Sequence, residues 1–521
     1  MKKYLTSLNI VFAVEVSVVA LASLGIIPRE SVLFLTGLMI FYIIFSPSND
    51  ALYLLIMSIP VFAALPLFDD FDSMANWRIL IAVLFLCLFF KNRFFINLIK
   101  KPVKKTSFKE ILKNHRMEML VLAFFLIAAL SIFAAGYKLI AVKKLLFLIN
   151  AFLLFLIVKN SARNKEIILK IWQASALAGG LVIGVALAQL IVVLFVPLYT
   201  FWQFWASKII SALYGQNLAY LLSYSNTWFA YFSGNQPPVL RLFSVFPDSH
   251  SLAMFLIFME PVFLGLAVLF NAERKKKIFY LALAILSLLL VVLTGSRGAW
   301  LSFIPAFAVA LFLFWRRIEL FLTKKAVLVL SAFIVLFLAS TFYPPVLYKF
   351  QSWQSGQSQE FSNEAFSFFK RAKSISDISE TSNKGRLEIW RASAKSIITH
   401  PVLGVGLGNY VTVLDEDISF AKKGASAHNL YLDFAAEIGV PGALILIAIF
   451  IGVLGAAWVV FRRSKEAHFK IFGLLFGIYF LWILGYSLFD VVLLNDKVLL
   501  LFMVELGMIF SLKNLVPGSE N

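Results

Sequence analysis

The sequence predicts an all-α membrane protein, a polytopic bundle of about 12 to 14 transmembrane helices with one large helical loop on the outer side. Of the 521 residues, 61% are hydrophobic and 14% are charged, whereas charged residues make up about 25% of an ordinary soluble domain. The apolar residues gather in blocks of roughly 20, the length at which a helix crosses a ~30 Å hydrocarbon core. These observations exclude a soluble domain, a coiled coil and a disordered chain.

Fourteen apolar runs, each bounded by charged or turn residues, are candidate membrane spans. The short run 31–46 and the long run 167–197 are compatible with half-helices in the interface, so twelve or thirteen crossings are also possible. The expected spans are 8–27, 31–46, 50–67, 76–90, 117–135, 139–158, 167–197, 249–270, 276–294, 298–315, 325–343, 438–461, 469–490 and 494–512.

The positions of lysine and arginine predict a cytoplasmic N-terminus. Nine basic residues lie from Lys91 to Arg116 and four from Arg274 to Lys277, both in connections that would then face the cytoplasm. The short outer connections carry about one basic residue each. The formal net charge of +19 is therefore explained by topology rather than by nucleic-acid binding. Cys87, the only cysteine, lies in an apolar span and provides no disulfide framework.

Two outer connections are longer than the others. Residues 198–248 are rich in aromatic clusters, and residues 344–427 form the one large polar region, in which residues 386–398 have helical spacing until His400-Pro401 stops the run. The expected organisation is N-terminal transmembrane helices (1–197), central transmembrane helices with the aromatic segment and arginine motifs (198–343), the large outer loop (344–427) and C-terminal transmembrane helices (428–521).

Arg297 occupies a tight break between two apolar spans, within residues 294–300, at the outer edge of the bilayer. A charge at membrane depth costs about 2.5 to 3.5 kcal/mol on insertion scales, so this arginine is a functional candidate. The alternative role is a snorkelling side chain that reaches the lipid headgroups.

Two more arginines belong to outer segments. Arg241 follows two prolines and precedes a helix that Asp248 would cap, with His250 in its first turn. Arg386 lies one turn before Trp390 on the helix of the large loop. The alternatives are an interfacial anchor for Arg241 and a solvated surface arginine for Arg386.

Glycines alternate with apolar residues in the segment 401–410, at positions Gly404, Gly406 and Gly408. The spacing is not that of a dinucleotide-binding turn. It predicts a turn in which the backbone packs closely, and a loop that wraps a phosphate is the functional alternative.

The segment 426–442 is the most informative. Ser426 is expected to cap a helix and His428 to lie in its first turn, where the positive end of the helix dipole favours a neutral imidazole that can act as a base. Asn429, Asp433 and Glu437 follow at four-residue intervals and form a polar stripe on an otherwise apolar helix. The alternative is a polar network that only pins the helix to its neighbours.

Acidic residues provide little indication of a metal site. The segments 70–72 and 415–417 match the short carboxylate pair of metal-dependent nucleotide-sugar transferases, but solvated loop acids explain them better. Glu15, Glu260 and Glu505 lie within apolar spans and are expected to be buried or hydrogen-bonded inside the bundle.

Together these motifs resemble the O-antigen ligase and O-antigen polymerase superfamily, over residues 240–445. The resemblance rests on Arg241, the Ser296-Arg297-Gly298 break, the Gly385-Arg386 to Trp390 helix, the His400-Pro401 to Tyr410 segment and the His428-Asn429 to Gly442 helix.

The resemblance implies a bacterial glycosyltransferase of the cytoplasmic membrane whose active site faces the periplasmic or outer side. Its donor would be a glycan on a polyprenyl diphosphate, its acceptor a lipid, glycan or protein, and it would need no metal, cofactor or nucleic acid. His428 corresponds to the catalytic histidine of the ligases. The diphosphate-binding arginines correspond to Arg241, Arg297 and Arg386, and we expect supporting roles for His250, Asn429, Asp433 and Glu437.

Elementary chemistry agrees with this implication. A glycosyl diphosphate already carries a good leaving group, so the enzyme must mainly neutralise the departing charge, which the planar fork of arginine does well. A base then accepts the proton of the acceptor hydroxyl, and backside attack inverts the anomeric carbon.

A flippase for lipid-linked glycans is the competing class. The single large outer loop, the lack of a recognisable half-repeat and the placement of the candidates on one side of the membrane argue against it. Ligation, polymerisation and transfer to protein use nearly the same chemistry, and the sequence does not separate them.

Overall fold

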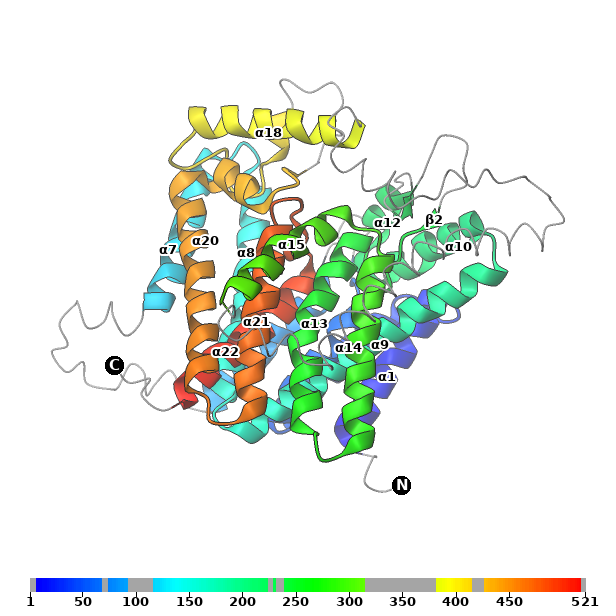
Figure 1. Ribbon diagram of the computed structural model, residues 1–521. Coiled ribbons are helices and arrows are strands. Elements are labelled where there is room, and N and C mark those ends of the chain that lie inside the picture. Colours follow the sequence, from blue (N-terminus) through cyan, green and yellow to red (C-terminus); the bar gives the residue numbers. More distant parts are fainter. Residues whose placement is uncertain are drawn as a thin grey trace, which may run out of the picture. The chain divides into compact units, whose positions relative to one another are not determined.

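The computed structural model describes residues 6–67, 74–91, 116–223, 228–230, 239–313, 381–414 and 426–516. These residues are almost entirely helical (Figure 1), apart from the antiparallel pairing of β1 (Phe229–Ala230) with β2 (Val239–Leu240). Nine helices in the described part are long and apolar enough to cross a membrane, and four shorter apolar helices accompany them. The predicted all-α polytopic membrane fold is confirmed.

The helices follow the expected spans because a backbone in lipid must satisfy its hydrogen bonds within the helix. Thirteen of the expected runs contain described helices, and most boundaries lie within a few residues of the expected ones. Two differ more: the run expected over 50–67 is helical only to Val61, and the run expected from 438 belongs to a helix that begins at Leu430. The run 325–343 lies outside the described residues, as do the acidic segments 70–72 and 415–417 and most of the large loop 344–427.

By its internal contacts the chain divides into two compact units, described separately here. Unit 1 comprises Met1–Leu80, Leu169–Ser376 and Leu481–Ile483, and unit 2 comprises Ile81–Ile168, Asp377–Phe480 and Leu484–Asn521. Helices α4 (Trp77–Lys91), α9 (Lys165–Phe195) and α21 (Ala467–Tyr486) contribute residues to both.

Unit 1 is built around the hairpin of α13 and α14, which pack side by side (Figure 1). Helix α13 is the most buried of the apolar helices, and Glu260 within it accepts a hydrogen bond from the Ser287 hydroxyl of α14. The helices of the unit are α1 (Ser7–Leu24), α2 (Ser31–Phe45), α3 (Ser48–Ser58), α10 (Leu198–Phe204), a π-helix (Trp205–Ile210), α11 (Ser211–Tyr214), α12 (Gln216–Ser223), α13 (Ser249–Leu269), α14 (Arg274–Leu293) and α15 (Arg297–Leu313).

Unit 2 contains four helices, α7, α8, α20 and α22, around an apolar cavity of about 110 Å³. Leu430 and Phe434 from the first turns of α20 line this cavity together with phenylalanines of α7, α8 and α22. The elements of the unit are α7 (Arg116–Leu130), η2 (Ser131–Ala134), α8 (Lys138–Ser161), α18 (Thr381–Thr399), α19 (Val411–Leu414), α20 (Leu430–Arg463), α21 (Ala467–Tyr486), η6 (Val492–Leu494) and α22 (Asp496–Leu515).

The three acids expected inside the bundle are all buried. Glu15 accepts a hydrogen bond from the Ser58 hydroxyl, as Glu260 does from Ser287. Glu505 on α22 has no hydrogen-bond partner among the described residues. The expectation that these acids are buried in the bundle is confirmed.

The predicted orientation can be tested with two exposed positions on either side of α20. In a Cys87→Ser background, Ile398→Cys at the end of α18 should react with a membrane-impermeant maleimide added to intact spheroplasts, because the large loop is expected outside. Lys465→Cys, just beyond the end of α20, should react only after permeabilisation. The reverse pattern would show that the topology is inverted.

Candidate active site

The arginine motifs of unit 1 meet at the end of the α13–α14 hairpin where α13 begins and α14 ends. Arg241, directly after β2, donates from Nε to the Thr294 carbonyl at 3.0 Å, and its Nη2 lies 3.2 Å from Nε2 of His250. His250 Nδ1 lies 3.0 Å from the Ser296 hydroxyl. One chain of polar contacts thus joins the residue after β2 and the first turn of α13 to the turn that follows α14.

The chemistry of these groups decides the tautomer of His250. A guanidinium only donates hydrogen bonds, so the imidazole Nε2 must accept from Arg241. The ring proton is then on Nδ1, which donates to Ser296 Oγ. His250 therefore links the guanidinium of Arg241 to the residue that directly precedes Arg297.

Local sequence explains both helix starts in this group. Asp248 caps α13 by accepting from Ser251 N–H at 2.7 Å, as predicted, and His250 lies in the first turn. At the start of α15, Gly295 takes a positive φ of 64° and the Ser296 hydroxyl accepts from Ala299 N–H at 3.4 Å. Arg297 is the first residue of α15 and is half-buried.

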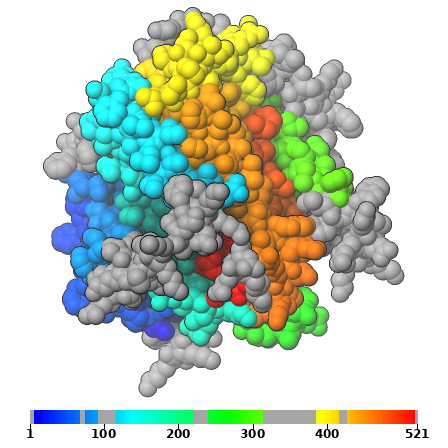
Figure 2. Space-filling model, turned by 90° about the vertical axis from the view of Figure 1, so that its left-hand side faces the viewer, coloured from blue at the N-terminus to red at the C-terminus, as the bar shows by residue number. Residues whose placement is uncertain are grey.

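In unit 2, α18 lies across the ends of α7, α8 and α20; it is yellow in Figure 2, above the cyan and orange helices. The predicted helix 386–398 is confirmed, and it ends at Thr399, just before Pro401. Trp390 of α18 donates from Nε1 to the carbonyl of Ala427 at 3.0 Å. Arg386, half-buried and one turn earlier, is therefore on a helix that is tied to the residue before His428.

The expected helix cap in this region is wrong. Asn429, not Ser426, caps α20, and its side-chain oxygen accepts from the N–H groups of Tyr431 and Leu432. Asparagine accepts these bonds well with an extended backbone. The Ser426 hydroxyl instead accepts from His428 N–H at 3.3 Å. His428 consequently precedes the helix rather than lying in its first turn.

His428 has a left-handed backbone with φ of 46°, which is uncommon for a residue other than glycine. The conformation is held from both sides, because the preceding residue bonds to Trp390 and Asp433 and the following residue caps α20. Its Nδ1 is buried and has no hydrogen-bond partner among the described residues. Non-glycine residues in this region persist only where the surroundings over-determine them, which is typical of functional sites.

Helix α20 is broken one turn before Pro441, at Ile438 and Gly439. In a continuous helix the proline ring would clash with the carbonyl four residues earlier, that of Glu437. Here the Glu437 carbonyl accepts from Gly406 N–H at 2.9 Å, and the Ala436 carbonyl accepts from Val405 N–H at 2.8 Å. The glycine segment thus supplies the hydrogen bonds that the break leaves unmade.

The alternating glycines serve close packing. A Cβ atom at Gly404 would lie 2.3 Å from the Ala436 carbonyl oxygen, and one at Gly406 would lie 2.4 Å from the Cβ of Ala135. Most amides of the segment donate within the protein, including Leu407 N–H to the Ser131 hydroxyl at 3.1 Å. These contacts favour the packing interpretation over a loop that wraps a phosphate.

The break predicts a large effect for Gly439→Ala. Gly439 has φ of 75° and ψ of 172°, and a Cβ there would lie 2.2 Å from the Val402 carbonyl oxygen. Backbone strain alone in this region costs about 1 to 3 kcal/mol, and the clash adds to it. We expect a clearly lower melting temperature in detergent, whereas Gly455→Ala, which meets nothing within 4 Å in the same helix, should be neutral. Equal melting temperatures for the two variants would contradict the packing role.

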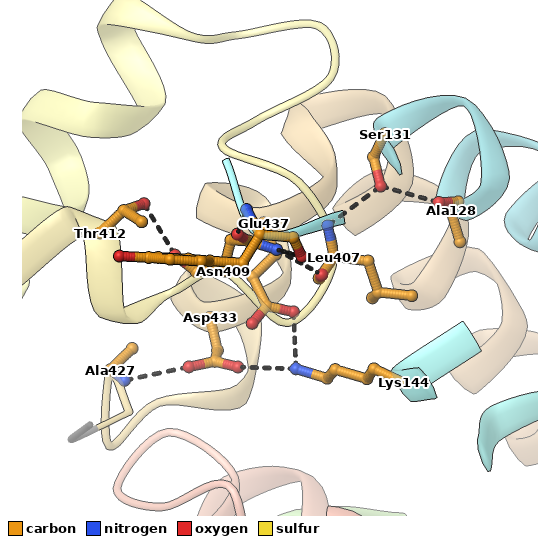
Figure 3. A network of polar contacts seen from close by, with 10 residues as sticks. Ala128, Ser131, Lys144, Leu407, Asn409, Thr412, Ala427, Asp433 and Glu437 are labelled. Carbon is orange, nitrogen blue, oxygen red and sulfur yellow. Dashed lines mark hydrogen bonds and ion pairs between the residues drawn. The ribbon is translucent and has the colours of Figure 1, made fainter. Parts of the chain in front are cut away.

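A polar network joins α8, the glycine segment and the first turns of α20 (Figure 3). Lys144 of α8 donates to Glu437 at 2.6 Å and lies 3.9 Å from Asp433, and Asp433 accepts from Ala427 N–H at 3.0 Å. Asn409 accepts from Tyr137 N–H at 2.7 Å, which ties the glycine segment to the start of α8. Both carboxylates are buried. Asp433 and Glu437 lie on one face of α20, as predicted, because both contact Lys144. Asn429 instead precedes the helix and caps it.

Tyr410 closes the glycine segment beside this network. Its hydroxyl is hydrogen-bonded to that of Ser393 on α18. Burial, followed by the charges of Asp433 and Glu437, raises the pKa of Tyr410 to about 12, against the lowering effect of the Ser393 bond. Tyr410 is therefore protonated at neutral pH. Its hydrogen bond to Ser393 ties α18 to the glycine segment.

Residues 282–447 match the family model described as O-antigen ligase. We call residues 282–447 the O-antigen ligase domain, after the family model that they match. The match confirms the resemblance to the O-antigen ligase and polymerase superfamily that the motifs predicted. No curated protein matches the chain.

The O-antigen ligase domain contains Arg297, Arg386 and His428, whereas Arg241 and His250 precede it. The structure brings the predicted residues together in two groups. One joins Arg241, His250 and the turn before Arg297 in unit 1; the other joins His428, Asn429, Asp433 and Glu437 in unit 2, with Arg386 on the helix above.

Sequence reasoning missed Lys144. It lies in an apolar span far from the motifs, and its partners are about 290 residues away along the chain. A lysine within an apolar run was an available signal, because such residues pair inside a bundle. Among the described residues, no group of three or more His, Cys, Asp or Glu side chains is arranged to hold a metal ion.

Proposed function

We propose that this protein is a metal-independent, inverting glycosyltransferase that moves glycan from a polyprenyl diphosphate to an acceptor hydroxyl on the outer face of the cytoplasmic membrane. The observation that supports this most is His428, which lies in the O-antigen ligase domain directly before a membrane helix with its backbone held on both sides.

In this mechanism His428 accepts the proton of the acceptor hydroxyl while the hydroxyl oxygen attacks the anomeric carbon. A new carbon–oxygen bond forms as the bond from that carbon to the diphosphate breaks, and the electron pair leaves with the diphosphate. Attack on the face opposite the leaving group inverts the anomeric configuration. The buried, unpartnered Nδ1 leaves the other ring nitrogen as the atom that we assign to proton transfer.

Arg241, Arg297 and Arg386 are assigned to the diphosphate, whose negative charge grows as the bond breaks. Two phosphate oxygens are bound best by a guanidinium with a fixed plane. The Thr294 carbonyl and His250 restrict Arg241 in this way. An arginine that only reaches lipid headgroups does not need such partners, so these contacts favour the phosphate-binding role for Arg241.

Asn429, Asp433 and Glu437 are assigned supporting roles because their contacts are to the protein. Asn429 caps α20, and the two acids share Lys144. His250 is likewise assigned to hold Arg241.

The proposed function is tested with purified protein, a defined polyprenyl-diphosphate-linked oligosaccharide and an acceptor glycolipid, with EDTA present. We expect transfer at an unchanged rate and a product whose anomeric configuration, measured by NMR, is opposite to that of the donor. Inhibition by EDTA that added magnesium or manganese reverses would contradict metal independence. Movement of the donor across vesicle membranes without any transfer would instead support a flippase.

A further inference from the structure

The O-antigen ligase domain depends on a residue outside it. Lys144 lies in α8, well before residue 282, yet it forms an ion pair with Glu437 and lies beside Asp433. Its side chain is 22% exposed, and those of Asp433 and Glu437 are 4% and 2% exposed. Two buried carboxylates one turn apart repel each other, so the lysine supplies the charge that allows both to be buried together.

Asp433 connects this ion pair to the backbone before His428. One carboxylate oxygen faces Lys144, and the other accepts from the N–H of Ala427 at 3.0 Å. The carbonyl of Ala427, which belongs to the peptide bond of His428, accepts from Trp390 Nε1. Ala427 is therefore held at both its N–H and its carbonyl, and it is fully buried.

This double hold explains how His428 keeps a left-handed backbone. The conformation of His428 is set by the peptide on each side, and the following side is fixed by the Asn429 cap. Asp433 holds the peptide between Ser426 and Ala427, while Trp390 and the Ser426 hydroxyl hold the next peptide, between Ala427 and His428. Without the acceptor on Asp433 the buried N–H of Ala427 would lack a partner, so Ala427 would shift and His428 would return toward the more common right-handed or extended regions. The direction of its imidazole would change with it.

We infer that Lys144 and Asp433 are positioning residues for the proposed transfer reaction: Lys144 holds Asp433, and Asp433 holds Ala427, the residue whose placement orients His428. The inference rests on the proposed function of His428 as the base. It adds Lys144 of α8, which lies in the N-terminal part of the chain, to the residues that the reaction needs. Figure 3 shows Lys144 beside both carboxylates and Asp433 directed toward Ala427.

The decisive comparison is Asp433→Asn against Asp433→Leu. Both remove the charge and keep four side-chain heavy atoms branched at Cγ, but only asparagine keeps an oxygen that can accept from Ala427 N–H. We expect kcat to stay within about tenfold of the wild type for asparagine and to fall by about 100-fold for leucine, because a misplaced reacting group costs about that much. The KM for the donor should change little in either variant.

Lys144→Met provides the second comparison. It should lower kcat, and Lys144→Arg should restore most of it. Lys159→Met is the matched control, because Lys159 lies on the same helix with 18% exposure, an ion pair to Glu118 and an aromatic ring nearby, as Lys144 has Phe434. We expect Lys159→Met to alter thermal stability at most and to leave kcat unchanged.

Equal kcat values for Asp433→Asn and Asp433→Leu at matched thermal stability would overturn the positioning role. A rise in donor KM with unchanged kcat in Lys144→Met would also overturn it, by placing Lys144 against the substrate. His428→Ala is measured in the same assay. If that variant keeps its turnover, the proposed function fails, whereas loss in His428→Ala with full activity in Asp433→Leu shows that only the positioning inference fails.

Discussion

His428→Ala should lower the rate of glycan transfer by about 100- to 10,000-fold, because a positioned general base contributes about 10² to 10⁴ in rate and His428 is the base we assign to the acceptor hydroxyl. The protein should still insert in the membrane and bind the polyprenyl-diphosphate glycan, since this side chain acts on the acceptor rather than the donor. The rate is measured with a defined donor and acceptor, and donor binding is measured separately on the same preparation.

The left-handed backbone of His428 makes a second variant necessary. Asparagine adopts this conformation more readily than alanine and cannot act as a base, so His428→Asn separates loss of the base from loss of the local fold. The control is His400→Ala, because His400 is exposed at the end of α18 in the same unit. We expect the Ala and Asn variants to be equally inactive and His400→Ala to be active. Near-normal turnover in His428→Asn would remove His428 from the mechanism.

Arg297→Lys should lower the rate by about 100-fold at unchanged expression. Loss of one well-placed donor to a developing negative charge costs roughly 3 kcal/mol, and lysine keeps the charge but not the planar fork that binds two oxygens. Arg297→Ala should be slower still, since it loses both charge and geometry. The three forms are compared for transfer from a defined lipid-linked donor, with melting temperature recorded for each.

Arg462→Lys is the matched control for Arg297. Arg462 is exposed in the last turn of α20 and lies 5.8 Å from the ring centroid of Trp458, as expected of an arginine that anchors a helix end at the headgroups. Lysine should replace it without loss of activity. Full activity in Arg297→Lys as well would show that Arg297 is also an anchor and has no role in binding the diphosphate.

The helices of this protein could be predicted from the sequence because their cause is local. A run of apolar residues in lipid has to satisfy its own backbone, so composition over about 20 residues decides that a helix forms and roughly where it ends. The helix cap at Asp248 and the stop before Pro401 also follow from residues within a few positions. The helix cap near His428 was misassigned because Ser426 and Asn429 are both good caps by type, and the contacts of α20 selected Asn429.

The site itself was only partly predictable. Arg241 and the turn before Arg297 were recognised one at a time, but the imidazole of His250 that joins them depends on how β2, α13 and α14 meet. The glycines of 401–410 suited both close packing and phosphate wrapping. The break at Gly439 favours close packing, because the carbonyls of Ala436 and Glu437 that the break leaves without helical partners accept from amides of this segment.

The polytopic helical membrane fold and the similarity of residues 282–447 to O-antigen ligases could be read from the sequence, since hydropathy and short motifs are properties of neighbouring residues. The backbone of His428, the break in α20 and the pairing of Lys144 with Glu437 depend on contacts between distant segments and became visible only in the folded chain. A buried charge, or a backbone carbonyl without a helical partner, has to be paired with a group that the fold places beside it, whatever its distance along the chain. For Glu437 that group is Lys144, about 290 residues away in sequence.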